Sequence, residues 1–187
     1  MNVIDAAADP PRSILLQAAS GEPTAARELL DATSSTVYGF IFARVGGVQE
    51  TAEDLTQATY LEAMRSARTY RGDAAVETWL CAIARRQVAK HYKSERRRER
   101  LERKLRLVAE EPEPDEDTDD GSPVDAEVMI AALGRLVPLH RQVLVLKYLD
   151  GRSVEQIAEE LGRSKIQVQS LLQRARSGLK RELEAAR

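Results

Sequence analysis

Apolar residues recur with helical spacing along most of the chain. They predict a short helix near Ser13–Ser20, a second over Pro23–Gly46, and a third over Val48–Ser66. A fourth begins near Ala75, where apolar residues are spaced i, i+3, i+4, i+7, i+8 and i+12, the pattern of a helix buried on one side. No run of alternating β-branched residues indicates a strand, so the pattern favours an all-α protein.

The same periodicity predicts which side chains of these helices face inward. In the second helix the expected stripe is Ala26, Leu29, Leu30, Thr33, Val37, Phe40 and Ile41. In the third helix it is Leu55, Ala63, Met64 and Ala67, and in the fourth it is Val76, Trp79, Leu80, Ile83, Ala84 and Val88. Trp79 lies on an apolar stripe, so we expect it to be structural.

The C-terminal part predicts a helix near Arg141–Leu149 and then two further helices in close succession. Ser153 and Ser164 each precede an apolar stripe, and each has a glutamine three residues later, which is the capping-box pattern of a helix start. Gly162 separates the two helices. Two capped helices joined by a three-residue turn with glycine indicate a helix-turn-helix.

Charge divides the chain into three parts. Residues 1–108 carry 17 basic and 14 acidic side chains, residues 109–127 carry ten acidic and no basic ones, and residues 128–187 carry 11 basic and six acidic ones. The acidic stretch Glu110–Asp125 contains proline and glycine and no apolar periodicity, so it predicts a flexible linker. Each of the flanking basic modules could bind a polyanion, although the net charge of the chain is −2.

Composition excludes several classes of protein and site. The single cysteine, Cys81, cannot form an intrachain disulfide, and His91 and His140 have no ligand partners at useful spacing, so we expect neither a metal nor another cofactor. An enzyme would need a cluster of nucleophile, base or metal ligands, which the sequence does not offer. The apolar runs are too short to span a bilayer and the start is unlike a signal peptide, so we expect a soluble cytoplasmic protein.

The last helix carries a polar and basic face that suits duplex DNA. In a helix-turn-helix the second helix enters the major groove, where Gln and Arg can pair with base edges and Ser and Lys suit phosphates. The bland alternative is the solvated face of an ordinary helical hairpin. The solvent-facing set consists of Lys165, Gln167, Gln169, Ser170, Gln173, Arg174 and Arg176.

Two weaker patterns lie upstream. Over Tyr70–Tyr92 a basic helix face adjoins a short polar loop edged by aromatic residues, which could hold single-stranded DNA, and Arg96–Arg98 continue as either a solvated surface or a phosphate contact. The acidic start of Gln49–Met64 stabilises a helix N-terminus, and it could also form a protein-docking face.

Taken in order, these segments resemble a known family. The chain contains DLTQATYLEA, then TYRGD, then TWLCAIARR, an acidic spacer, and RQVLVLKYLDGRSVEQIAEELGRSKIQVQSLLQRAR. This order is similar to the extracytoplasmic-function (ECF) sigma factors, and the likeness runs from about Leu15 to Leu183. The resemblance implies sigma domain 2 over residues 1–95, a basic helix extension and acidic linker over 96–127, and sigma domain 4 over 128–187.

The resemblance also implies a role for each matching position. The expected contacts to the clamp helices of core RNA polymerase are Glu53, Asp54, Leu55 and Gln57. The expected contacts to the −10 element, in the melted non-template strand, are Tyr70, Arg71, Gly72, Asp73, Arg85, Arg86 and Lys90. The expected contacts to the −35 duplex are Arg163, Ser164, Lys165, Gln167, Gln169, Ser170, Gln173, Arg174 and Arg176. An anti-sigma factor is a further expected partner, and no membrane insertion is expected.

Three other functions compete with this interpretation. A conventional DNA-binding regulator with a helical sensor domain would bind its operator without polymerase. An enzyme with a helical catalytic domain is disfavoured because the histidines and the cysteine lack partners. An interaction scaffold that imitates a sigma factor is disfavoured by the intact basic face of the last helix.

Overall fold

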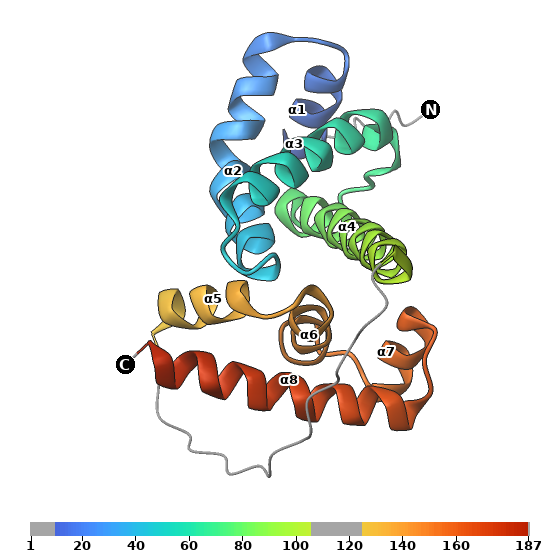
Figure 1. Cartoon of the computed structure of the whole chain (residues 1–187). Helices are drawn as coiled ribbons and strands as arrows, with labels where there is room; N and C mark the ends of the chain where they lie inside the picture. The colour runs from blue at the N-terminus through green and yellow to red at the C-terminus, as the bar shows by residue number, and fades with distance from the viewer. Residues whose placement is uncertain (1–9, 106–124, 187) are drawn as a thin grey trace, which may run out of the picture. The chain divides into compact units, whose positions relative to one another are not determined.

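The protein is described by a computed structural model that covers residues 10–105 and 125–186, and in these ranges it contains helices and turns and no strand (Figure 1). The all-α prediction is therefore confirmed. Contacts divide the chain into two compact units, one formed by Met1–Ile41 and Gln49–Val88 and the other by Phe42–Val48 and Ala89–Arg187. The predicted acidic linker lies largely outside the described residues.

The first unit is built from the helices of the N-terminal part. They are α1 (Pro10–Ala19), α2 (Pro23–Arg44), α3 (Gln49–Ser66), the single 3-10 turn η1 (Ala67–Thr69) and the start of α4, which runs over Val76–Leu105. Their core is aliphatic and includes Leu15, Leu29, Val37, Leu80 and Ile83. The four helices expected from the sequence are all present.

The buried face of α2 differs from the expected one. Ala25, Leu29, Thr33, Val37 and Ile41 are buried, a strict i, i+4 row, whereas Leu30 is 43% exposed. Thr33 can occupy the core because its hydroxyl donates to the Leu29 carbonyl at 2.7 Å and lies 2.7 Å from the hydroxyl of Tyr60 on α3. A buried polar group with both contacts made does not carry the cost of an unsatisfied one.

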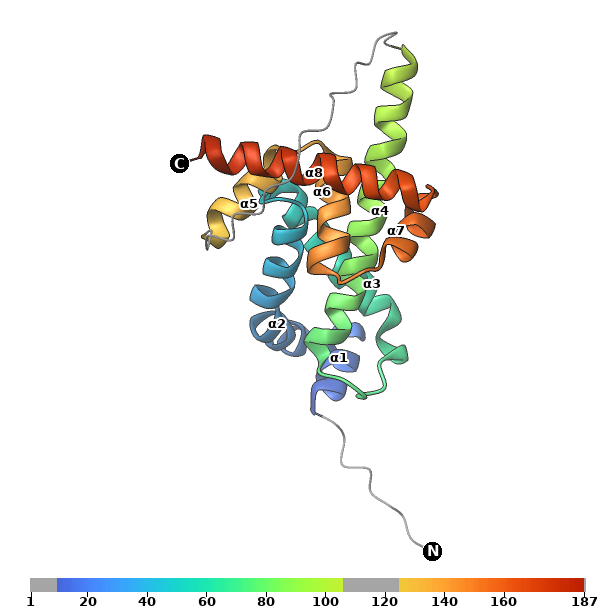
Figure 2. The same ribbon diagram turned by 90° about the horizontal axis from the view of Figure 1, so that it is seen from below.

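The second unit contains the C-terminal helices. They are α5 (Ala126–Arg135), α6 (Pro138–Leu144), the π-helical turn η2 (Val145–Leu149), α7 (Val154–Leu161) and α8 (Lys165–Ala185). Figure 2 shows α6 crossing α8, and the two helices bury Val143, Leu144, Leu171 and Leu172 in one hydrophobic cluster. Residues of α7 and α8 also belong to this cluster, so it fixes the two helices against α6.

Two features of this unit were not expected from the sequence. α5 begins at the Asp125 cap, whose carboxylate accepts from the Glu127 amide at 3.1 Å. Its last carbonyls are satisfied by the buried guanidinium of Arg141, which donates to Leu133, Gly134 and Leu136. A cation is favourable there because the helix C-terminus carries unpaired carbonyls and a partial negative charge.

Candidate nucleic-acid interface

The two last helices start at reciprocal caps. The Ser153 hydroxyl accepts from the Gln156 amide at 3.2 Å, and the Gln156 side chain accepts from the Ser153 amide at 3.0 Å. Ser164 and Gln167 form the same pair of bonds at 3.2 and 2.9 Å. Both predicted capping boxes are confirmed, and together they satisfy orphan amides at the start of α7 and of α8.

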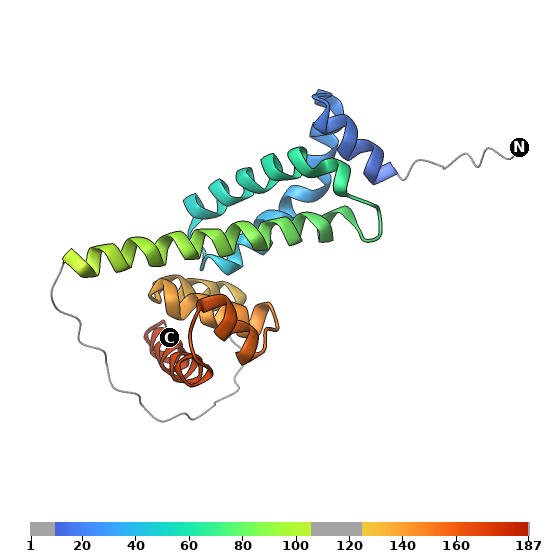
Figure 3. The same ribbon diagram turned by 90° about the vertical axis from the view of Figure 1, so that its right-hand side faces the viewer.

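The turn between the helices depends on one glycine. Gly162 ends α7 in the left-handed region with φ +63°. Its amide donates to the Glu159 carbonyl at 3.2 Å and the next amide, of Arg163, donates to the Ala158 carbonyl at 2.9 Å. These are the two bonds of a Schellman motif, in which a residue with a Cβ would be strained. The turn directs the chain from α7 straight into α8 (Figure 3).

The amphipathic division of α8 decides which side chains remain outside. Val168, Leu171, Leu172 and Ala175 are buried against Ile157 and the rest of the cluster. The predicted DNA-facing set lies away from this stripe. Arg163, Ser164, Lys165, Gln167, Gln169, Ser170 and Arg176 are exposed, whereas Gln173 and Arg174 are half-buried.

The first turn of α8 is tied to α7 by an ion pair. The ammonium of Lys165 lies 2.9 Å from a carboxylate oxygen of Glu155, at the start of α7. The hydrogen bond from Lys165, supported by those from the Glu155 amide and Ser153, lowers the pKa of Glu155 to about 2. Lys165 therefore already has an anionic partner in the protein, for which a DNA phosphate would have to compete.

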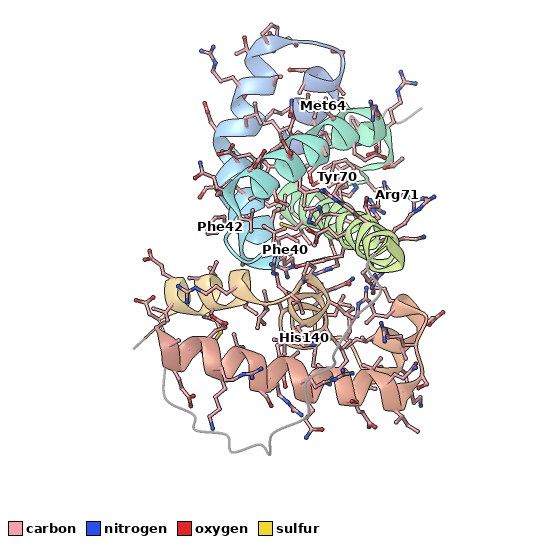
Figure 4. The ribbon with its side chains drawn as sticks, in the orientation of Figure 1. Phe40, Phe42, Met64, Tyr70, Arg71 and His140 are labelled. Carbon is pink, nitrogen blue, oxygen red and sulfur yellow. The ribbon has the colours of Figure 1, made fainter. Side chains whose placement is uncertain are left out.

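Positive charge continues along α8. His140 lies on α6 (Figure 4). Burial is the main cause that lowers the pKa of His140, and the nearby cations Arg174 and Arg181 lower it further. Arg174 and Arg181 therefore both disfavour a positive charge on His140. Cations on a DNA-facing helix can contact a phosphate backbone.

The predicted loop in the first unit has a buried foundation. Tyr70 is only 3% exposed, its hydroxyl donates to the Ala74 carbonyl at 2.7 Å, and its ring centroid lies 5.4 Å from that of Trp79. Arg71 (Figure 4) and Asp73, in contrast, are exposed according to their accessible surface. Tyr70 thus supports the loop from below, while the neighbouring charged residues face solvent.

The basic residues predicted on α4 differ in exposure. Arg86 and Lys90, one helical turn apart, are exposed. Arg85 is half-buried, and its guanidinium lies over the ring of Phe40 at 5.6 Å from the centroid. A cation held against an aromatic face has less freedom than one on open surface. Among these three predicted residues, the exposed charge therefore belongs to Arg86 and Lys90.

The predicted docking residues lie in the first half of α3. Glu53, Asp54 and Gln57 are exposed and Leu55 is half-buried. The side-chain amide of Gln49 donates to the Glu53 carboxylate at 2.8 Å. Asp54 and Gln57 are three residues apart and so share a helix face.

One exposed residue of α8 escaped the sequence reasoning. Ile166, in the first turn, is 78% exposed. The signal was available, because the buried stripe at positions 168, 171, 172 and 175 excludes position 166. Because it is apolar, Ile166 does not belong to the polar set expected to contact DNA.

Within residues 10–105 and 125–186 no three His, Cys, Asp or Glu side chains gather closely enough to hold a metal ion. None of the helices in those ranges has the length and apolar character needed to cross a membrane.

The sequence matches two family models and several curated proteins. Residues 29–98 match Sigma-70 region 2, and residues 126–179 match Sigma-70 region 4. The ECF RNA polymerase sigma factor BldN of Streptomyces coelicolor is 36% identical over 85% of this chain, which spans 60% of the length of BldN. The RNA polymerase sigma factor YlaC of Bacillus subtilis is 30% identical, with 81% of this chain and 87% of YlaC covered.

A similar solved structure is the sigma factor RpoE from Bartonella quintana, crystallised with the anti-sigma factor NepR. It is 23% identical, covers 86% of this chain and 98% of its own, and has a TM-score of 0.46. Region 2 precedes region 4 in this chain, which is the order expected from the sequence, and region 4 contains the capped helix-turn-helix. The chain belongs to the extracytoplasmic-function family of RNA polymerase sigma factors.

Proposed function

We propose that this chain binds core RNA polymerase and directs transcription initiation at promoters by recognising their −35 and −10 elements. The observation that carries the proposal is the match of one chain to both Sigma-70 region 2 and Sigma-70 region 4. Two modest DNA sites on one chain gain from effective concentration when both can be reached together. Polymerase would fix their separation and so allow both to bind one promoter.

The −35 duplex is proposed to lie along the exposed face of α8. The polar side of the first two turns of this helix is exposed, as a recognition helix in the major groove requires. Gln169, Ser170, Gln173 and Arg174 would reach base edges, and Arg163, Ser164, Lys165, Gln167 and Arg176 would position the phosphates. Arg174 is proposed to make a paired contact, because a guanidinium can bind two acceptors of guanine at once.

The −10 element is proposed to bind as melted single strand to the loop after η1 and to α4. Arg71, Gly72 and Asp73 would contact an unstacked base, with Tyr70 holding the loop in place through its bond to Ala74. Arg85, Arg86 and Lys90 would follow the backbone of the strand. A positively charged surface that follows the backbone is the electrostatic part of single-strand capture.

Core polymerase is proposed to dock on α3 through Glu53, Asp54, Leu55 and Gln57. Asp54→Ala should weaken core binding by about three- to tenfold, the range for a charged contact at an interface rim, while the helical CD spectrum stays unchanged. Asp31→Ala, an exposed acidic residue on α2, is the matched control. Equal pull-down of core polymerase by wild type and Asp54→Ala would refute the docking role.

The remaining assignments follow from family membership. We propose sigma domain 2 over residues 1–95, an extension and linker over 96–127, and sigma domain 4 over 128–187. The chain itself would catalyse no reaction and need no cofactor, and it would work in the cytoplasm. Because members of this family are commonly held inactive by an anti-sigma factor, we also propose such a partner here.

Run-off transcription tests the central proposal. Core polymerase with the full chain, on genomic fragments from the source organism, should start at sites that core alone does not use. Arg174→Ala should then reduce output from a −35-dependent promoter by about fivefold or more, since one paired base contact contributes about 1–3 kcal/mol. Arg135→Ala, which removes an exposed cation from α5, is the control. Initiation at no new site would overturn the proposal.

A conventional regulator is the second candidate, because a capped helix-turn-helix with a basic face is also what a stand-alone DNA-binding protein needs. A gel shift on the same promoter separates the two functions. The sigma-factor proposal expects a specific complex only with core polymerase. A specific complex of equal affinity without core would favour the regulator.

A further inference from the structure

Ile166 is the most exposed large apolar side chain in the described part of the chain, at 78%. A single exposed hydrophobic residue on a protein surface is common and needs no explanation by itself. Its position is what matters here. It is the second residue of α8, the helix proposed to enter the major groove, and it is not needed for the packing of that helix.

Helix geometry puts Ile166 in the centre of the exposed face. Residues advance by about 100° around a helix, so Ile166, Gln169, Ser170 and Gln173, at i, i+3, i+4 and i+7, fall on one side. The buried stripe that contains Val168 and Ala175 falls on the opposite side, with its mean direction roughly 170° away from that of Ile166. Ile166 is therefore in line with the polar residues proposed to touch base edges.

Its two neighbours in the first turn are already engaged within the protein. Lys165 is ion-paired with Glu155 at 2.9 Å. The side-chain oxygen of Gln167 accepts from the Ser164 amide at 2.9 Å in the capping box. Each points about 100° away from Ile166 around the helix axis. Of these three side chains, the one that points directly away from the protein is therefore the apolar, branched side chain of Ile166.

The major groove displays one apolar group among the standard bases, the C5-methyl of thymine. An isoleucine gains nothing from the hydrogen-bonding edges of the other bases and would strip water from them at a cost. Its β-branched side chain is stiff at χ1 in a helix, so it presents a fixed apolar surface. We propose that Ile166 reads the C5-methyl group of one thymine in the −35 element, an inference that rests on the proposed function of α8.

Deoxyuridine supplies the test, because it lacks this methyl group and keeps the base-pairing edge of thymine. Each thymine of the −35 element, on either strand, is replaced in turn, and the affinity of core polymerase with the full chain for the duplex is measured. One replacement should weaken wild type by about fourfold, the value expected for one buried methyl group. Ile166→Ala should bind the unmodified duplex about fourfold more weakly, and the same replacement should then have no further effect.

Two comparisons make the result specific. Ile166→Val keeps a branched apolar side chain and should keep most of the sensitivity to the methyl group. Leu30→Ala, which removes an exposed apolar side chain from α2, should leave that sensitivity as in wild type. Equal sensitivity of wild type and Ile166→Ala, no sensitive thymine, or a −35 element without thymine on either strand would each overturn the inference. If core polymerase with the chain initiates at no new site, the proposed function fails before this series begins.

Discussion

Replacing Ser164 by alanine should loosen the first turn of α8. The substitution removes the hydroxyl that accepts from the Gln167 amide at 3.2 Å, and it leaves the reciprocal bond, from the Ser164 amide to the Gln167 side chain, without its partner bond. Replacing a capping serine by alanine costs about 0.5–2 kcal/mol. Both residues are exposed, so water can take over the freed amide, and we expect about 1 kcal/mol.

Hydrogen exchange of the full chain measures this cost locally. A cost of about 1 kcal/mol raises the open fraction of the first turn about fivefold, so amides around Gln167 and Val168 should exchange about fivefold faster. Peptides from α2 and α3 should exchange as in wild type. The global helical signal should hardly change, because the buried stripe of α8 is untouched.

The chain offers two matched controls for this experiment. Ser164→Asp keeps an acceptor at the helix start and should exchange like wild type or more slowly. Ser153→Ala breaks the equivalent cap and should loosen α7 while α8 stays protected. Exchange in Ser164→Ala within about twofold of wild type would show that the cap does not fix the start of α8.

Two further predictions concern stability. Gly162→Ala should destabilise the C-terminal unit by about 1–2 kcal/mol, because a Cβ is disfavoured in the left-handed region. Gly39→Ala should instead stabilise the protein by about 0.5–1 kcal/mol, because Gly39 lies within α2, where alanine favours the helix and the added Cβ meets no other atom. Urea unfolding followed by CD gives both values, and shifts in the same direction would contradict the reasoning. The pKa of Glu155 is lowered to about 2 from about 4.5, so the stabilisation from its contact with Lys165 is complete above pH 4.5 and is lost as the pH falls toward 2. Urea midpoints measured over that pH window should show this loss for wild type but not for Glu155→Gln, and Glu159→Gln serves as the control. The same dependence of the urea midpoint on pH in wild type and in Glu155→Gln would refute the assignment.

Local features of this fold could be predicted from the sequence. The capping boxes at Ser153 and Ser164 join residues three apart, so the residue types alone determine whether the bonds can form. The same holds for Gly162, because a left-handed turn between two amphipathic helices needs a residue without a Cβ. The helix-turn-helix was predictable because its determining contacts are short in sequence.

Features that depend on distant contacts could not be predicted. The apolar periodicity of α2 places both Leu29 and Leu30 in its core, because the two residues are adjacent and both are apolar. Packing against the other helices buries the row through Leu29 and leaves Leu30 exposed. Tyr70 was expected at a DNA-binding edge, yet it is buried against Trp79, nine residues later. The helix α5 could not be predicted, because the burial of its apolar side chains depends on α8, which follows it by about 30 residues.

The contact between Tyr70 and Trp79 has a practical consequence. Trp79 is the sole tryptophan of the chain, and its ring packs beside the aromatic side chain that carries the loop after η1. Its fluorescence is therefore a built-in optical reporter confined to that corner of the protein. Ligand arrival at this loop becomes observable in unlabelled protein, with no dye to perturb the surface being probed.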